Sequence, residues 1–205
     1  MDRRNNYAIQ VQQAKKYFLT YNQQKMIAKC HLEADETYIY AKMLGSQYRL
    51  NRRNGDLERR ENDIWIDGNT FGEVMTLLDL LCDSREDRFL TGRWTSLQAL
   101  GLQFHQNLVE DGKDDLAELF DREPERLHRA CKALGGEAIK GADIAYAVEL
   151  FDGLRIGIQF WHGDEEFAPR LRFMLDENAK MYLKYETMHY MIGTLRTRLR
   201  TLGEV

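Results

Sequence analysis

A short loop with three carboxylates and an imidazole has the residue types best suited to chemistry in this chain. It reads Trp161-His162-Gly163-Asp164-Glu165-Glu166-Phe167-Ala168-Pro169 and follows an apolar run that ends at Phe160. His162, Asp164 and Glu166 are the candidate metal ligands, because imidazole and carboxylate groups bind divalent cations. The same three residues are the candidate catalytic groups, since a neighbouring indole such as that of Trp161 can raise a carboxyl pKa toward the range of a general acid or base.

A purely structural interpretation of this loop is also open. Gly163 and Asp164 have the residue types of a turn that leaves a strand, and Pro169 ends extended structure. In this interpretation Trp161 and Phe167 pack in the core, while the acids are solvated or cap backbone amides. The two interpretations differ in whether the carboxylates converge on one point beside the indole.

Two further places are candidates for ligand binding. The period of two along a strand puts Gly157 and Trp161 on one face, and the missing side chain of Gly157 would leave a shallow space there for a flat ligand or for another side chain. Arg93 and Trp94 are the second candidate, because a guanidinium stacked on an indole near a helix N-terminus could bind an anion. The structural alternative for this pair is a buried tryptophan beside an ordinary capped turn.

Helical patterns predict several of the elements that position these residues. Apolar residues at steps of four and three predict one long helix from Tyr7 to about Ala28. A capping-box spacing at Thr70 and Glu73 opens a second helix, which runs to about Cys82. The same spacing predicts a short helical turn from Thr95. Further helices are predicted at Asp115–Phe120, from Pro124 to Gly135-Gly136, and at the C-terminus after Met181-Tyr182-Leu183.

Strand patterns come in adjacent hairpins, which indicates the fold class. The first predicted strands, Thr37–Leu44 and Gln47–Leu50, belong to a meander that has a type I′ turn at Asn54-Gly55 and ends near Ile66. A hairpin is predicted from Ala142–Leu150 and Leu154–Phe160, which Asp152-Gly153 joins. A last strand is predicted at Leu171–Leu175. Since hairpins rather than alternating helices connect the strands, we expect an α+β fold with a mostly antiparallel sheet. A long N-terminal helix, central helices and a C-terminal helix would pack that sheet.

Length, charge and cysteine content narrow the class of protein. The 205 residues predict a single domain over 1–205, with a candidate helical insertion over about 70–135. A protein with a net charge of −4 has no overall positive electrostatic potential that would attract a polyanion, so no nucleic acid partner is expected. The absence of a signal core and of about 18 consecutive apolar residues argues against export and against a membrane partner. The three cysteines are odd in number and far apart, as is typical of the reducing cytoplasm.

Several segments together resemble a known family. They are Phe160–Phe167, Met174-Leu175-Asp176, Met181-Tyr182-Leu183 and the upstream Leu90–Leu97. Their order resembles a family of bacterial and archaeal domains of unknown function, which carry a Trp-x-Gly-Asp-Glu-Glu-Phe stretch followed by Leu-Phe-Asp and Tyr-Leu. The resemblance spans roughly residues 30 to 200.

The resemblance also carries expectations about individual residues. It implies a candidate shared site or a shared structural corner made of Trp161, Gly163, Asp164, Glu166, Phe167 and Asp176. This chain has Met174-Leu175-Asp176 where the family pattern has Leu-Phe-Asp, so a contact made by that phenylalanine is not expected here. Some relatives add an iron-sulfur module of the corrinoid-protein kind with clustered cysteines. No iron-sulfur cluster is expected in this chain, and no other cofactor is indicated.

Three hypotheses for the function remain open at this point. The first is an accessory module that binds a small ligand, a metal or a protein partner at the Trp161–Glu166 loop, with Arg93, Trp94 and Asp176 nearby. The second is an acid-base or metal-assisted enzyme that uses Asp164 or Glu166 as base and His162 as ligand or proton relay. The third is a structural or interaction protein. Its partner surface would be the acidic run from Glu110 to Glu123 or the arginines near the C-terminus. The oligomeric state is left open by the sequence.

Overall fold

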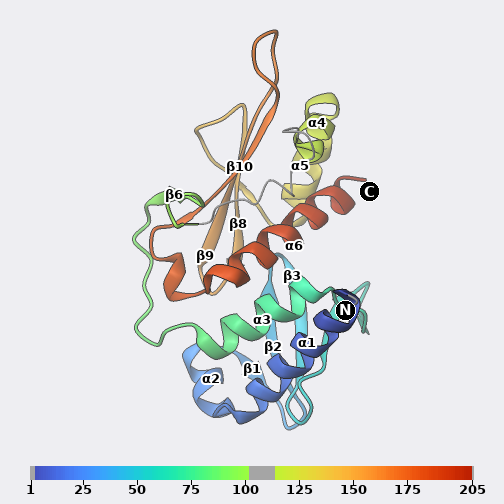
Figure 1. Ribbon diagram of the computed structural model, residues 1–205, viewed down its shortest axis with the longest axis vertical. Helices are drawn as coiled ribbons and strands as arrows, with labels where there is room; N and C mark the ends of the chain where they lie inside the picture. The colour runs from blue at the N-terminus through green and yellow to red at the C-terminus, as the bar shows by residue number, and fades with distance from the viewer. Residues whose placement is uncertain (1–2, 102–113, 205) are drawn as a thin grey trace. The chain divides into compact units, whose positions relative to one another are not determined.

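The computed structural model describes residues 3–101 and 114–204 of the chain. In this part it has six α-helices and two five-stranded sheets in which every paired strand is antiparallel, which confirms the predicted α+β class (Figure 1). The chain divides into two compact units. Unit 1 contains Met1–Arg88 and Met181–Thr194, and unit 2 contains Phe89–Lys180 and Leu195–Val205. None of the helices in the described residues combines the length and the apolar character needed to span a membrane.

The sheet of unit 1 is a meander, as predicted. Its strands follow chain order: β1 (Glu33–Ala34), β2 (Tyr38–Met43), β3 (Ser46–Asn51), β4 (Leu57–Glu61) and β5 (Ile64–Ile66). The predicted two-residue turn at Asn54-Gly55 is wrong, because the loop from β3 to β4 covers five residues, 52–56. The amide of Asn51 donates to the carbonyl of Asp56, and the amide of Gly55, at a φ of +73°, donates back to Asn51. Polar side chains also hold the loop: Asn51 accepts from the Arg53 amide, and Asn54 accepts from the Asp56 amide.

The helices of unit 1 are α1 (Arg3–Thr20), α2 (Gln23–Lys29), α3 (Phe71–Asp83) and the first part of α6 (Tyr185–Glu204). The predicted single helix to Ala28 is wrong, because the first helix ends at Thr20 and a second begins at Gln23. Oδ1 of Asn22 accepts a hydrogen bond from the Lys25 amide at 3.0 Å and so caps α2 as a separate helix. The apolar spacing continues across the break, which explains why periodicity alone missed it.

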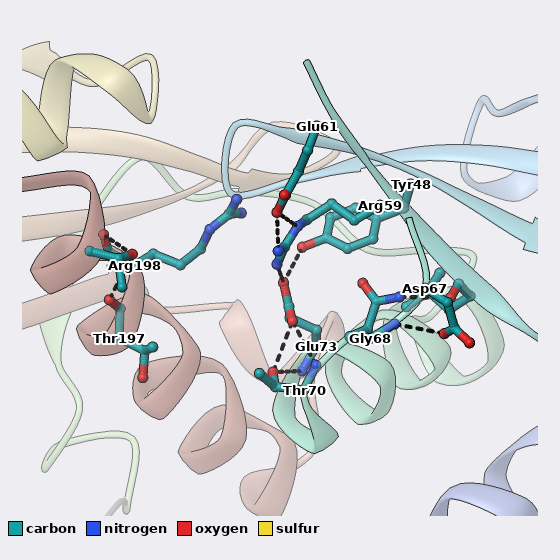
Figure 2. A network of polar contacts seen from close by, with 12 residues as sticks. Tyr48, Arg59, Glu61, Asp67, Gly68, Thr70, Glu73, Thr197 and Arg198 are labelled. Carbon is teal, nitrogen blue, oxygen red and sulfur yellow. Dashed lines mark hydrogen bonds and ion pairs between the residues drawn. The ribbon is translucent and has the colours of Figure 1, made fainter. Parts of the chain in front are cut away.

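The predicted capping box of α3 is confirmed, and its glutamate does more than cap. Figure 2 shows the Glu73 carboxylate among Thr70, Tyr48 and Arg59. One oxygen, Oε2, accepts from the Thr70 amide at 2.8 Å, while Oε1 accepts from the Tyr48 hydroxyl at 2.9 Å and from the Arg59 guanidinium. Burial raises the pKa of Glu73, but the donors from Thr70, Tyr48 and Arg59 outweigh it and hold the pKa below its usual value. The buried carboxylate therefore joins α3 to the meander.

Unit 2 is built around a second antiparallel sheet with the order β6-β10-β9-β8-β7. The strands are β6 (Trp94–Ser96), β7 (Glu137–Ala138), β8 (Ile144–Phe151), β9 (Leu154–Trp161) and β10 (Arg170–Asp176). The predicted β8–β9 hairpin is confirmed, with Asp152 and Gly153 both at positive φ, 48° and 79°. Positive φ at both central residues is the requirement of a type I′ turn. The predicted strand over Leu171–Leu175 is confirmed and is longer by one residue at each end.

The helices of unit 2 are α4 (Asp115–Arg122), α5 (Pro124–Ala133) and the end of α6, and a 3₁₀ turn, η3 (Ala179–Met181), precedes α6. Both predicted central helices are confirmed. The predicted helical turn from Thr95 is wrong, because Thr95 lies within β6 and pairs with Leu175. The turn instead begins at Ser96, whose hydroxyl accepts from the amide of Ala99 at 3.1 Å. Buried residues of this core include Phe120, Leu127, Val148, Ile156, Ile158, Phe160 and Leu175.

Candidate functional site

The Trp161–Pro169 loop connects β9 to β10 and is fastened to α4 by its histidine. The Nδ1 atom of His162 lies 2.9 Å from Oδ1 of Asp121, and the Gly163 amide donates to the same oxygen at 3.2 Å. The His162 side chain and this amide hold the pKa of Asp121 below its usual value. The amide of His162 donates to Asp143 at 2.9 Å. The base of the loop is therefore held by two aspartates that lie outside it.

Within the loop, Asp164 has a local role. Its Oδ1 accepts from the amides of Glu166 and Phe167 at 2.9 and 2.7 Å, and its own amide donates to the Phe167 carbonyl. This is the turn geometry of an aspartate that caps backbone amides. Glu165, Glu166 and Phe167 are exposed, and the phenylalanine is 69% exposed rather than packed in the core.

The loop does not gather its acids around the indole of Trp161. A shallow open depression beside the loop is lined by Asp121 and Gly163–Pro169, and Trp161 is not among the lining residues. Trp161 is half-buried, and the guanidinium of Arg170 lies 6.0 Å from its ring centroid. The structure thus places Asp164 and Glu166 at this depression and His162 next to one of its lining residues, Asp121, but leaves Trp161 outside it.

The shallow space predicted over Gly157 is filled by the protein itself. A Cβ atom added at Gly157 would lie 3.3 Å from Cζ3 of Trp94 and 3.4 Å from Cβ of Met174. Trp94 reaches this position from β6, which pairs with β10 on the far side from β9. Gly157 therefore accommodates a tryptophan ring of the same chain, so that of the two expected occupants of this space a side chain, and not a flat ligand, lies here.

Arg93 and Asp176 fasten the segment before β6. Arg93 pairs with Glu177, with 2.6 Å between Nη2 and Oε2. The buried carboxylate of Asp176 accepts from the amides of Thr91, Gly92 and Asn178 at 3.2, 2.8 and 2.9 Å. Burial raises the pKa of Asp176, but these amides outweigh it and hold the pKa below its usual value. Asp176 therefore links the end of β10 to the residues that directly precede β6.

The acidic run and the arginines near the C-terminus partly pair with each other inside unit 2. Glu110 and Asp111 of the run lie outside the described residues. Asp114, the N-cap of α4, binds Arg196 with 2.7 Å between Oδ1 and Nη2. The neighbouring Asp115 binds Arg200 with 2.5 Å between Oδ2 and Nη2. These charges hold α4 against the end of α6.

A cavity that the sequence analysis did not predict lies in unit 1, between α1, α3 and the start of α6. The cavity has a volume of about 360 Å³ and combines an apolar wall with a charged end. Its lining residues are Gln10, Gln13, Ala14 and Tyr17 from α1, Met75, Leu78, Asp79, Cys82 and Asp83 from α3, and Lys184, Glu186, Thr187 and Tyr190 at the start of α6. Figure 1 shows α1 and α3 side by side along the meander.

Aromatic contacts and one glycine position the three helices around this cavity. The ring of Phe71 on α3 stacks on Tyr7 of α1, with 4.6 Å between centroids, and meets the edge of Tyr190 on α6 at 4.9 Å. At Gly72 the two helices α3 and α6 approach closely, because an added Cβ atom would lie 2.5 Å from the Thr194 hydroxyl. A side chain at position 72 would push α6 away and change the shape of the cavity.

Two aspartates, a lysine and two tyrosines converge at the charged end of the cavity. The ammonium of Lys184 lies 3.2 Å from Oδ1 of Asp79 and 2.5 Å from Oδ2 of Asp83. The other oxygen of Asp83 accepts from the hydroxyls of Tyr17 and Tyr21 at 3.0 and 2.9 Å. The Lys184 amide donates to Asp79 at 3.1 Å. Tyr17 of α1, Tyr21 and Lys184 thus hold Asp83, whereas Asp79 is held by Lys184, which directly precedes α6.

The electrostatics of this cluster set its protonation. Burial raises the pKa of Asp79 despite its contacts with Thr187 and Lys184. Burial also acts to raise the pKa of Asp83, but the donors Lys184 and Tyr21 outweigh it and lower that pKa. Burial acts to lower the pKa of Lys184, yet the two aspartates raise it well above its usual value. Lys184 therefore stays protonated at neutral pH and is not available as a nucleophile.

One signal in the sequence pointed to this cluster. The α3 segment Val74–Asp83 is apolar apart from Thr76, Asp79 and Asp83, and the two aspartates stand four residues apart. A spacing of four puts both carboxylates on one helix face, where an apolar helix has no reason to keep acids. Their partners lie about 60 and 100 positions away in the sequence, so their convergence depends on the tertiary structure.

Neither site has the geometry of a metal centre in the described part of the chain. Across residues 3–101 and 114–204, no group of three or more histidine, cysteine, aspartate or glutamate residues is arranged to hold a metal ion. In particular, His162, Asp164 and Glu166 do not form such a group.

A family model described as "Domain of unknown function (DUF3786)" matches residues 22–198. No curated protein and no solved structure matches the chain.

Proposed function

The chain belongs to the DUF3786 family of unknown function, and we propose from its own residues that it is a binding module for a small organic ligand. The ligand occupies the cavity between α1, α3 and α6. The observation that carries the proposal is the convergence of Asp79, Asp83 and Lys184 at one end of an otherwise largely apolar cavity. Ligand sites in proteins are typically concave and mostly apolar, with a few polar groups that fix the orientation of the ligand.

The size of the cavity supports a small ligand. Its volume of about 360 Å³ lies at the lower end of the range of about 300–1,000 Å³ that is typical of small-molecule sites. Perturbed pKa values that cluster in a cavity are a further sign of a functional site. The protonated state of Lys184 favours binding over catalysis through a lysine nucleophile.

A fragment screen by ligand-observed NMR tests the proposal. We expect fragments whose signals change with the wild-type protein and no longer change with Ala14→Trp, which fills the cavity from α1. The matched control is Ala8→Trp, an equally large change at an exposed position of the same helix, and it should leave binding unchanged. Fragments that bind the folded Ala14→Trp variant as they bind the wild type would contradict the proposal.

A second candidate function is proton transfer at the Trp161–Glu166 loop, and the pair His162–Asp121 favours it. A carboxylate on Nδ1 orients an imidazole, and when Nδ1 carries the proton, Nε2 is the basic atom. In this function His162 is the base, and the exposed Glu166 is a second proton carrier. Hydrolysis of p-nitrophenyl acetate provides the test, with Asp121→Asn and His162→Gln both expected to slow it. A wild-type rate no greater than that of free N-acetylhistidine would exclude this function.

A further inference from the structure

The ionisable groups of the cavity favour a cationic occupant. Asp79, Asp83 and Glu186 contribute carboxylates to the lining, whereas Lys184 is its one ammonium group among the described residues. The two aspartate side chains are only 8% and 17% exposed, so their charge acts in an environment that screens it weakly. A ligand with a positive group at this end would complement the excess of negative charge.

The side chain of Lys184 identifies the chemical group that fits between the aspartates. Its ammonium bridges Asp79 and Asp83 at 3.2 and 2.5 Å, while the side chain as a whole is 57% exposed. The lysine thus reaches from the solvent side to two carboxylates that are mostly buried. Beyond the aspartates lie Ala14, Met75 and Leu78, which offer apolar surface to an alkyl chain.

We propose that the cavity binds a primary alkylamine, whose ammonium replaces that of Lys184 between Asp79 and Asp83 and whose chain lies along Ala14, Met75 and Leu78. This inference rests on the proposed binding function and adds the class of ligand to it. Lys184 then acts as an internal competitor, which fills the ammonium position of the empty site and swings into solvent when a ligand enters. No covalent bond is formed or broken.

The competition with Lys184 sets how affinity depends on the ligand. A tethered group competes at an effective concentration on the order of millimolar, so a short amine such as ethylamine binds weakly. Each methylene buried along the apolar wall raises affinity about fourfold. Affinity is therefore expected to rise from ethylamine to n-butylamine to n-hexylamine. It should exceed that of the corresponding alcohol, which lacks the charge.

Calorimetric titration with n-hexylamine and 1-hexanol at pH 7 tests the inference. With the wild type, we expect n-hexylamine to bind at least tenfold more tightly than 1-hexanol, and Asp83→Asn to abolish this preference. Removal of the competitor in Lys184→Met should increase the affinity for n-hexylamine about tenfold. The matched control is Lys42→Met, which removes an exposed lysine from the meander and should leave both affinities unchanged.

The outcomes separate the inference from the proposed function. Equal binding of n-hexylamine and 1-hexanol in the cavity would overturn the amine class and keep the small-ligand site. If neither compound binds, the proposal that the ligand is an alkylamine is contradicted. The fragment screen with Ala14→Trp then decides whether the cavity is a ligand site at all. If Lys184→Met does not fold, the wild-type comparison of amine with alcohol remains decisive because it needs no variant.

Discussion

The Nδ1 atom of His162 lies 2.9 Å from Oδ1 of Asp121, although the two residues stand 41 positions apart in the chain. The same carboxylate oxygen accepts the Gly163 amide, so one side chain of α4 holds both the imidazole and the backbone at the base of the loop. This contact makes the loop a fixed extension of unit 2 rather than an independent turn.

Asp121→Ala is expected to release the base of the loop. Without its acceptor the Gly163 amide loses its hydrogen bond, and local opening becomes more frequent. Hydrogen exchange measured by NMR should show faster exchange at Gly163 and at the neighbouring loop amides, while the amides of β8 are unchanged. Glu165→Gln is the matched control, because this exposed residue lies in the same loop. Unchanged exchange at Gly163 in Asp121→Ala would mean that the contact does not order the loop.

Asp176→Asn is expected to lower the free energy of unfolding by about 1–3 kcal/mol at pH 7, because an amide cannot accept all the donors that the carboxylate satisfies. The lowered pKa of Asp176 sets the sign of the pH dependence. Its stabilisation is fully present above the unfolded value of about 3.9 and is lost as the pH falls through the lower folded value. Urea unfolding at several pH values should therefore show the wild type and the variant converging below about pH 4.

The control for this experiment is Glu177→Gln, the neighbouring acid, whose pair with Arg93 is exposed. An exposed pair contributes about 0–1 kcal/mol, so this variant should stay close to the wild type. A loss in Glu177→Gln equal to that in Asp176→Asn would show that the buried amide contacts are not the cause.

Glu73→Ala is expected to destabilise the protein by about 3–5 kcal/mol. The substitution removes the buried carboxylate that both pairs with the Arg59 guanidinium and caps the N-terminus of α3. Tyr48→Phe removes a single donor to the same carboxylate and should cost about 1 kcal/mol. Chemical denaturation of both variants measures the two values. A cost for Glu73→Ala no larger than that for Tyr48→Phe would contradict the structural role of the network.

The cysteines are expected to resist alkylation in the folded protein. Burial raises the pKa of Cys82 and that of Cys131 to about 12, so that neither is a thiolate at pH 8. Cys30 is also buried. Mass spectrometry after treatment with iodoacetamide should find little modification of the native protein and three modified cysteines in urea. Rapid native labelling at Cys82, which lines the cavity, would show that the interior of unit 1 opens readily.

Local signals account for the parts of the fold that were predicted correctly. Thr70 and Glu73 stand within one turn, and Asp152-Gly153 has the composition of a type I′ turn, so short-range chemistry determines both. The errors at Ala28 and Thr95 have a common cause. In each case a polar side chain, Asn22 or Ser96, caps a neighbouring amide at a position that the pattern used for the prediction, the apolar spacing for Ala28 and the capping-box spacing for Thr95, does not reveal.

The candidate sites were less predictable because they depend on residues distant in the sequence. The loop residues His162 and Asp164 were visible as a cluster of polar types, but the partner that orients His162 belongs to α4. Trp94 could be singled out as an unusual residue, yet its position over Gly157 follows from the pairing of β6 with β10. The Asp79–Asp83 face could have been noticed as acids in an apolar helix.

By itself, the sequence determined the α+β class, the hairpins, the capped helices and the resemblance to the family, because these depend on the chemistry of neighbouring residues and on the period of apolar positions. The tertiary structure alone decided that Lys184 bridges Asp79 and Asp83, that Tyr17 and Tyr21 reach the same carboxylate, and that a cavity adjoins them. The physical reason is that burial and charge pairing act over distances in space. Residues about 60 to 100 positions apart acquire a common environment only when the helices that carry them pack.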